Sequence, residues 1–426
     1  MASIEEKIIE IKNQRWKSWD NILDHILDES KHKNSHLLKI NLVKSSKYKL
    51  IFQTVFIKDL PPFLKDSFVS KNTSKYKTNR NINCLVVPTG IGASIGGYAG
   101  DANPLCKLFS KDCDYLLTHP NVINGAVLSD PVHNSLILEG YFLDQFLLNN
   151  ISLKLSNPKI GIIFDSGINK QRLDYEINVI NALRAFLGVN IVGYTITKKN
   201  INIKTTINNL GFSTGNIKNI DYLCEAADRL IKQGVNKIAV CCKIKDSSLN
   251  KKYISGYGID PIGGIESRIS HILSYYTGHV CAHAPVLDSV ENADYKNIAP
   301  VSASEYIADT FLPSVISGLR FTPDIVKQTT TEKSNIYASE IKKIITPHSG
   351  FGSSGIIHHL LNKDLRRKVI LVKENQTCLD VNPLHISPSI NRINKYIDLA
   401  NKKDLMNIAI DLNILKRPLQ KVKYFN

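Results

Sequence analysis

The sequence predicts an α/β fold, in which helices cover both faces of a mostly parallel, Rossmann-like sheet, after a small N-terminal α+β region. Two observations favour this fold. Beyond residue 82, short apolar runs alternate with helical stretches, and the runs are apolar on both faces, as is typical of strands buried between helix layers. Three helical stretches also end at a glycine and lead directly into the next apolar run, which indicates parallel strands.

The N-terminal α+β region is expected to span residues 1–75. Residues 1–30 predict a helix, because apolar residues recur there at near-helical spacing. Two runs within residues 36–58 alternate with period two and predict strands. The polar stretch near residues 70–82 has no periodicity and predicts a linker, so that residues 82–426 form the α/β ligand-binding domain.

The second region is expected to contain seven buried strands joined mainly by helices. The predicted strands lie within residues 84–90, 115–120, 160–167, 189–197, 237–244, 279–285 and 368–375. The three clearest helices end at Gly188, Gly234 and Gly278. Glycine is favoured at the residue that follows a helix because it adopts the left-handed conformation without strain.

Composition places the chain among globular proteins, with 43% hydrophobic and 22% charged residues. No apolar run reaches the roughly 18 residues of a membrane span, and the N-terminus resembles neither a signal peptide nor a transit peptide. The eight cysteines in so long a chain are expected to be free thiols in a reducing compartment. The net charge of +16 comes largely from lysine, and an AT-rich coding sequence accounts for that bias.

The positive charge is concentrated in residues 31–80, which hold 12 Lys or Arg against Asp59 and Asp66. Nucleic acid or an anionic surface could bind such a segment. Arginine is scarce there, however, and no nucleic-acid-binding motif is present. A solvated lysine face is therefore favoured, and nucleic-acid binding is not expected.

Polar side chains gather at the carboxyl ends of the predicted strands, which is where open α/β sheets bind ligands. The first such cluster is "PTGIGASIGGYAGDANP", from Pro88 to Pro104, whose glycine-flanked backbone N–H groups could surround a phosphate or carboxylate. The alternative is a turn where backbones pack closely. Neither the P-loop nor the dinucleotide fingerprint fits its spacing, so the cofactor stays unassigned. The residues expected to bind a ligand are Thr89, Gly90, Gly92, Ser94, Gly96, Gly97, Asn121, Asn124, Asp260, Gly263, Gly264 and Asn375.

His119 is the leading candidate for proton transfer, because histidine titrates near neutral pH. Asp165 or Asp101 would orient it, and His283 would position the substrate or share in the chemistry. Cys281 and His283 lie two residues apart on one strand, but zinc needs a third protein ligand, so metal binding stays open.

Several segments together resemble a domain-of-unknown-function family of cyanobacteria and of algal and plant plastids. They are "VVPTGIGASIGGYAGDANP", "LLTHPNVINGA", "EGYFLDQF", "GIDPIGGIESRISH" and "CAHAP", and the resemblance covers about residues 82–375. It implies a cytoplasmic location in cyanobacteria or a stromal one in plastids. It implies no reaction and no catalytic residues.

These observations lead to one favoured function and one alternative. The first is a metabolic enzyme that binds a small anionic metabolite, bearing phosphate or carboxylate, at the glycine-rich loop. The alternative is a non-catalytic ligand sensor or assembly factor of photosynthetic cells, with the basic N-terminal region as its partner contact. The sequence does not indicate the oligomeric state.

Overall fold

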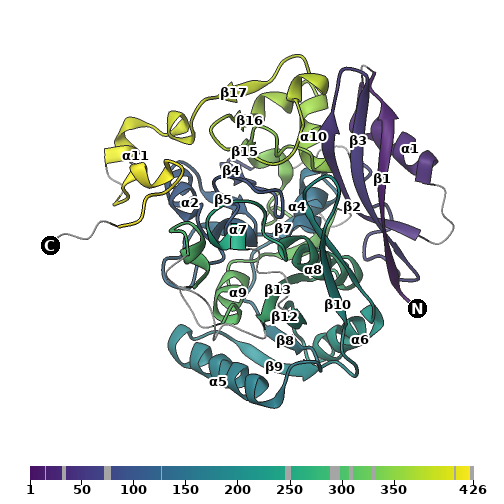
Figure 1. The fold of residues 1–426 in the computed structure, drawn as a ribbon, viewed down its shortest axis with the longest axis vertical. Coiled ribbons are helices and arrows are strands. Elements are labelled where there is room, and N and C mark those ends of the chain that lie inside the picture. The colour runs from purple at the N-terminus through teal and green to yellow at the C-terminus, as the bar shows by residue number, and fades with distance from the viewer. Residues whose placement is uncertain are drawn as a thin grey trace.

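Three large sheets and two small two-stranded ones build the described part of the molecule in the computed structural model, and Figure 1 shows the three large sheets. The structure describes residues 1–14, 16–30, 35–71, 78–125, 127–244, 251–287, 298–306, 310–328, 332–406 and 409–422. A six-stranded sheet lies at the top of Figure 1, a four-stranded sheet at the bottom and the N-terminal sheet at the right. The middle of the predicted linker, residues 72–77, falls outside the described residues.

The N-terminal sheet is antiparallel, with strand order β1-β3-β2, and helix α1 packs on β1. Its elements are β1 (Ser3–Lys12), α1 (Trp19–Ser30), β2 (Ser35–Ser45) and β3 (Lys49–Lys58). The single helix predicted for residues 1–30 is therefore wrong in its first half. Ile9 and Ile11 alternate into the core, and β1 pairs with β3 along its whole length, a contact between distant segments that local periodicity does not reveal.

The six-stranded sheet is parallel throughout, in the order β17-β16-β15-β4-β5-β6. Its strands are β4 (Ile82–Leu85), β5 (Tyr115–Thr118), β6 (Ser135–Ile137), β15 (Ile341–Pro347), β16 (Val369–Val372) and β17 (Asn391–Ile393). Helix α2 (Asn103–Ser110) packs on β4 and β5, and α10 (Ser354–Leu361) packs on β16 from the other side (Figure 1).

The four-stranded sheet is also parallel, in the order β13-β12-β8-β9. Its strands are β8 (Ile160–Phe164), β9 (Ile191–Ile196), β12 (Lys237–Ile244) and β13 (Val280–Leu287). Helices α6 (Ile220–Ile231) and α8 (Gly263–Thr277) pack together on one side, while α5 (Lys170–Leu187) and α9 (Leu312–Leu319) pack together on the other (Figure 1). The helix ends predicted at Gly188 and Gly278 are confirmed, because both glycines cap their helices with positive φ angles.

The remaining elements connect these layers. They are α3 (Pro120–Ile123), α4 (Gly140–Leu147), β7 (Ile151–Lys154), β10 (Ile203–Ile207), β11 (Ser213–Ile217), α7 (Lys251–Ile254), β14 (Asp324–Lys327) and α11 (Lys402–Met406). β10 pairs with β11, and β7 pairs with β14, both antiparallel. No helix in the described part of the chain is long and apolar enough to cross a membrane.

The predicted α/β fold is thus confirmed, with a division that the sequence pattern did not reveal. The chain builds β4 to β6 of one parallel sheet, then the whole four-stranded sheet, and then returns to add β15 to β17. β9 also differs from its prediction as a strand apolar on both faces. It is an edge strand, and Val192 and Tyr194 on it are exposed.

Candidate functional site

A cavity of about 230 Å³ lies where the three sheets meet. Its wall takes residues from β2 and β3, from the segments that follow β4 and β5, from α4, from the start of α8 and from β13. The carboxyl ends of strands from both parallel sheets therefore face one space, while the N-terminal sheet closes another side of it. The predicted site residues on the wall are Thr89, Gly90, His119, Asn121, Asn124, Asp260, Gly263 and His283.

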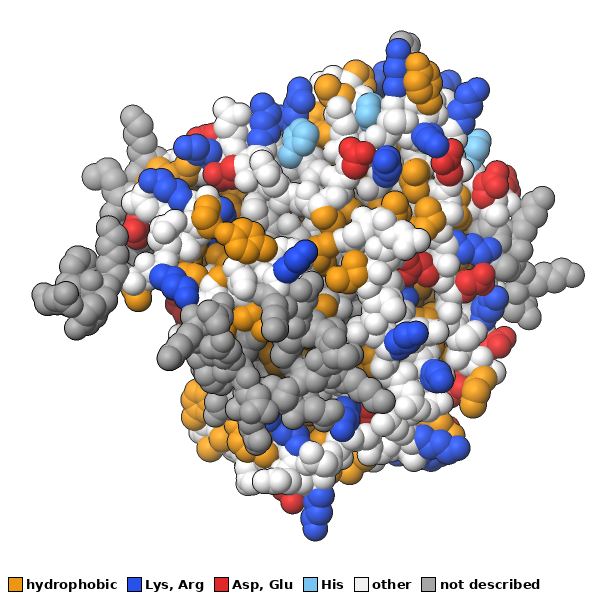
Figure 2. Space-filling model, in the orientation of Figure 1, with side chains coloured by type: hydrophobic (Ala, Val, Ile, Leu, Met, Phe, Trp, Pro, Cys, Tyr) orange, Lys and Arg blue, Asp and Glu red, His pale blue; other side chains and the backbone are white. Residues whose placement is uncertain are grey.

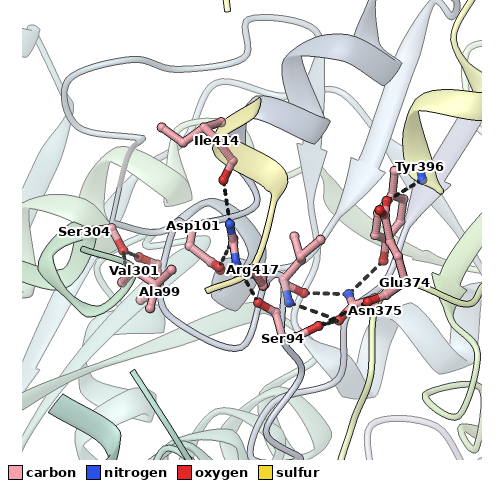
Figure 3. A network of polar contacts seen from close by, with 12 residues as sticks. Ser94, Ala99, Asp101, Val301, Ser304, Glu374, Asn375, Tyr396, Ile414 and Arg417 are labelled. Atoms are coloured by element: carbon pink, nitrogen blue, oxygen red, sulfur yellow. Dashed lines mark hydrogen bonds and ion pairs between the residues drawn. The ribbon is translucent and has the colours of Figure 1, made fainter. Parts of the chain in front are cut away.

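Other predicted site residues do not line the cavity: Gly92, Ser94, Gly96, Gly97, Asp101, Asp165, Gly264 and Asn375. Figure 3 shows why several of them lie elsewhere. The Arg417 guanidinium donates to the Ser94 carbonyl oxygen at 2.8 Å and to the Asp101 carboxylate at 2.9 Å. Asn375 accepts from the Ile95 backbone N–H at 3.0 Å. Side chains from the far C-terminal part of the chain thus hold this section of the glycine-rich loop, and it has a packing role there.

Close backbone packing also explains two of the glycines. A Cβ atom at Gly97 would lie 2.0 Å from the Ala93 carbonyl oxygen, and one at Gly264 would lie 2.0 Å from the Ser213 carbonyl oxygen. For Gly97, the alternative interpretation of the loop, a turn where backbones approach closely, fits better than a ligand cradle, and Gly264 at the start of α8 has a similar packing role. The loop borders the cavity through the segment from Pro88 to Ile91 and through Ala99.

Asp165 does not orient His119, because its carboxylate is occupied by the backbone. Its oxygens accept from the N–H groups of Gly167 at 3.0 Å, Ile201 at 3.1 Å and Lys243 at 3.3 Å. Burial raises the pKa of Asp165, and these N–H donors oppose that shift. The side chain ties together loops at the carboxyl end of β8.

The contacts of His119 favour another role than that of the general base that its position suggested. The Val87 backbone N–H donates to its Nε2 at 3.0 Å, so the proton of the neutral ring lies on Nδ1. Burial lowers the pKa of His119 to about 4, which keeps the ring neutral at physiological pH. His119 is therefore suited to donate a hydrogen bond from Nδ1, and neither Asp101 nor Asp165 orients it.

His283 and Glu266 form the pair that best fits acid–base chemistry. The chain leaves α8, turns at Gly278 and enters β13, so the first turn of α8 lies beside the carboxyl half of β13. His283 Nδ1 lies 3.1 Å from Glu266 Oε1. Nδ1 therefore donates to the carboxylate, and Nε2 carries the free electron pair of the neutral ring. Nε2 is buried and has no hydrogen-bond partner among the described residues.

Two further acidic residues, Asp260 and Glu305, line the cavity near Glu266. Glu305 accepts from the Ala99 backbone N–H at 3.0 Å and from the Tyr253 hydroxyl. Burial, with repulsion from Glu266, raises the pKa of Asp260 to about 7. Burial, with repulsion from Asp260 and Glu266, raises the pKa of Glu305 to about 8. Near neutral pH this pair holds a proton and can donate a hydrogen bond.

The charge on the wall does not favour the expected anionic ligand. The acidic side chains there are Glu139, Asp144, Asp260, Glu266 and Glu305. Lys39 is the only Lys or Arg among the described lining residues. Burial raises the pKa of Glu139 and Glu305 to about 8 and that of Asp260 to about 7, so these groups are largely protonated near neutral pH. What disfavours an anion is therefore that the described wall has only a single Lys or Arg side chain, and not repulsion by the carboxyl groups.

Lys39, Glu266 and Glu305 were not predicted from the sequence, whereas Glu139 was an acidic candidate, with an ordinary helix residue as the alternative. Glu139 caps α4, because its carboxylate accepts from the Tyr141 and Phe142 backbone N–H groups at 2.9 Å, and it lies 3.3 Å from His271 Nε2. A Cβ atom at Gly140 would lie 2.8 Å from that same nitrogen. Glu266 could have been identified as a site candidate from the sequence, because it lies in the first turn of a helix that follows a glycine-rich loop. No feature of the sequence marked Lys39 or Glu305 as a site residue.

The basic stretch is partly neutralised by its surroundings. Lys49 and Lys58 form ion pairs with Glu10 and Glu5 of β1, and Lys44 pairs with Asp380. On the face drawn in Figure 2, Lys and Arg side chains are spread among acidic and neutral ones and form no continuous patch. No group of three or more His, Cys, Asp or Glu side chains in the described ranges is placed to hold a metal ion.

The buried ionisable groups predict a stability optimum in mildly acidic solution. Burial raises the pKa of Glu139 and Glu305 to about 8, so these two groups bind more protons in the folded state between about pH 4.5 and pH 8, and their contribution to stability falls as the pH rises. Burial lowers the pKa of His119 to about 4 and that of His359 to about 3, so the contribution of these histidines falls as the pH drops below about 6.5.

We therefore expect the melting temperature to be highest between about pH 5 and pH 6.5 and to fall on both sides, as measured by differential scanning fluorimetry. Glu305→Gln has no proton to lose and is expected to flatten the alkaline side of this profile. A wild-type melting temperature that rises from pH 6.5 to pH 8 would contradict the assignment of raised carboxyl pKa values.

Comparison with known proteins shows the family to which the chain belongs. The family model described as "Protein of unknown function (DUF3326)" matches residues 82–415. The chain is also 32% identical to an uncharacterized lipoprotein of Synechococcus sp. over 346 residues, which is 80% of this chain and 95% of that relative. No solved structure matches the chain. The resemblance to a cyanobacterial family of unknown function is thereby confirmed, and the chain belongs to the DUF3326 family.

Proposed function

We propose that the protein is an enzyme that moves a proton on a small polar metabolite held in the cavity at the junction of the sheets. His283 is the proton-transferring base, and Glu266 holds its ring and stabilises the charge that forms when the ring gains a proton. His119 and the Asp260–Glu305 pair donate hydrogen bonds to the bound molecule. This assignment moves the leading role from His119 to His283.

One observation carries the proposal, namely the state of the His283 ring. Nδ1 is engaged by a carboxylate at 3.1 Å, whereas Nε2 is buried and has no partner among the described residues. A buried nitrogen without a hydrogen bond costs on the order of 1–3 kcal/mol, so a structural histidine would normally be satisfied on both sides. A carboxylate–imidazole pair with the second nitrogen free is the arrangement of a general base. His271 and Glu139 share this arrangement, but burial lowers the pKa of His271 well below its ordinary value, so His271 takes up a proton less readily than an ordinary histidine.

The wall supports a substrate with hydrogen-bond donors or a positive charge more than one recognised through a phosphate. Asn121 and Asn124 lie on the wall and can bind either kind of group through their amides. Gly90 and Gly263 also line the cavity and have no side chain, so backbone atoms border the cavity there. A volume of about 230 Å³ suits a metabolite of modest size.

The proposal is tested by incubating the full-length protein with a cyanobacterial metabolite extract in D₂O. Wild-type protein is expected to convert one metabolite, or to introduce deuterium at one of its carbon atoms, as detected by untargeted mass spectrometry. Native mass spectrometry of the same mixture reports binding independently. A metabolite that binds tightly but is neither exchanged nor converted would overturn the proposal and favour the ligand sensor.

We also propose a reducing compartment as the site of action, either the cytoplasm of a cyanobacterium or the plastid stroma. The support is that all eight cysteines are free thiols, most of them buried. Fractionation of cells that express the tagged chain would test this location, and recovery in an oxidising compartment would contradict it.

A further inference from the structure

Lys39 is the only Lys or Arg among the described residues that line the cavity, and it comes from outside the matched family region. It lies on β2, whereas the family match begins at residue 82. Within the described residues, no hydrogen bond or ion pair joins its ammonium group to another side chain, although it lies within electrostatic range of Asp144. The amine of Lys39 therefore lies at the cavity and is not engaged in a hydrogen bond or ion pair with another described side chain.

The local backbone shows how Lys39 comes to face this space. β2 pairs with β3, and the register shifts between Leu37 and Lys39, so Leu38 is an extra residue in the ladder. A bulge changes the side to which the following side chains point, and bulges are frequent beside active sites. Lys39, Ile40 and Asn41 all border the cavity directly after it.

We propose that Lys39 is a nucleophile that forms an imine with the carbonyl carbon of a small aldehyde or ketone bound in the cavity. This inference rests on the proposed function and names its substrate class. An imine withdraws electrons from the neighbouring carbon, and a base on the same wall, His283, can then take a proton from that carbon.

The step balances without any further reactant. The electron pair of Nζ attacks the carbonyl carbon and forms the C–N bond, and the carbonyl oxygen takes up a proton. The C–O bond then breaks, the oxygen leaves as water with both protons that the amine nitrogen has given up, and the C=N bond remains. Asp144 can carry these protons between nitrogen and oxygen, because burial raises its pKa to about 6.

The reactivity of the amine has a physical cause. Burial lowers the pKa of Lys39 to about 8, and the nearby Asp144 only partly opposes this shift. At about pH 7.5, about a quarter of such amines are uncharged, against about one in a thousand for an ordinary lysine. Only the uncharged amine attacks a carbonyl group.

The test treats the full-length protein with glycolaldehyde, acetone or pyruvate in the presence of sodium cyanoborohydride and maps modified lysines by peptide mass spectrometry. Lys39 is expected to be modified at least about tenfold faster than Lys44, a half-exposed residue of the same strand. Lys39→Arg keeps a positive charge but removes this modification, and Lys44→Arg is the matched control. Equal rates at the two lysines in wild-type protein would overturn the proposal, even if Lys39→Arg failed to fold.

The same reagents separate this inference from the proposed function. His283→Asn is expected to abolish deuterium exchange while the trapping at Lys39 persists. Deuterium exchange without trapping at Lys39 would contradict the imine and still support the acid–base pair. Trapping at Lys39 without exchange or conversion by wild-type protein would contradict the proposed acid–base function and support only the reactivity of the lysine.

Discussion

Replacing His283 by Asn is expected to lower the rate of deuterium exchange or conversion by about a hundredfold or more. The reason is that Asn has no basic nitrogen, and general-base catalysis contributes about 10²–10⁴ to a rate. Glu266→Gln still accepts the Nδ1 hydrogen bond but loses the negative charge, so a smaller decrease of about tenfold is expected. Rates are compared by following the identified metabolite in D₂O at equal protein concentration.

His359→Asn is the control for this prediction. His359 is as deeply buried as His283, but it lies on α10, where its Nδ1 contacts the Gly355 carbonyl oxygen at 2.9 Å, and it does not border the cavity. Its replacement is expected to affect stability and to leave the exchange rate per folded molecule unchanged. An equal loss of rate in the His283 and His359 variants would indicate that general destabilisation, and not the loss of a base, explains the effect.

The α/β fold was predictable because its signals are local. β8, β12 and β16 are short apolar runs that are buried on both faces, and α5 and α8 end at glycines with positive φ. The N-terminal strand was not predictable in this way. Its isoleucines fit a helix as well as a strand, and pairing with β3, about 40 residues further along the chain, decides between them.

The candidate site was predictable only where a residue lies on or follows a strand. His119 directly follows β5, whereas His283 lies in the middle of β13, which continues to Leu287, and both border the cavity. Asp101 and Asp165 have similar positions in the sequence, but Arg417 and three backbone N–H groups respectively engage them. Which polar side chain is free and which is already paired depends on contacts between distant segments, and a single sequence does not contain that information.

Glu6→Ala is expected to reduce the free energy of unfolding by about 3 kcal/mol, the largest effect on stability that we predict. Glu6 on β1 pairs with Arg268 on α8, whose side chain is 5% exposed. Without Glu6, the guanidinium keeps only the Gly215 carbonyl oxygen as a described hydrogen-bond acceptor and stays charged, because burial lowers its pKa only to about 10. Urea denaturation of the wild type and the variant measures the difference.

Glu10→Ala is the matched control, since Glu10 lies on the same strand but pairs with Lys49 where both side chains are about half exposed. Its removal is expected to change stability by about 0.5 kcal/mol or less. The double replacement Glu6→Leu with Arg268→Met removes both buried charges and is expected to recover most of the lost stability. A double variant as unstable as Glu6→Ala would show that the pair does not act as a unit.

This ion pair also joins the two halves of the proposed chemistry. Arg268 lies two residues after Glu266 on α8, and Glu6 belongs to the sheet that carries Lys39. Breaking the pair should therefore loosen the N-terminal sheet against α8 and separate the amine from the acid–base pair. We expect Glu6→Ala to lower trapping at Lys39 under conditions where the protein is still folded, and the double variant to restore it. Trapping that is unchanged in Glu6→Ala would mean that β2 is held at the cavity by its other contacts, such as the 2.8 Å hydrogen bond from the Leu42 N–H to the Gly352 carbonyl oxygen.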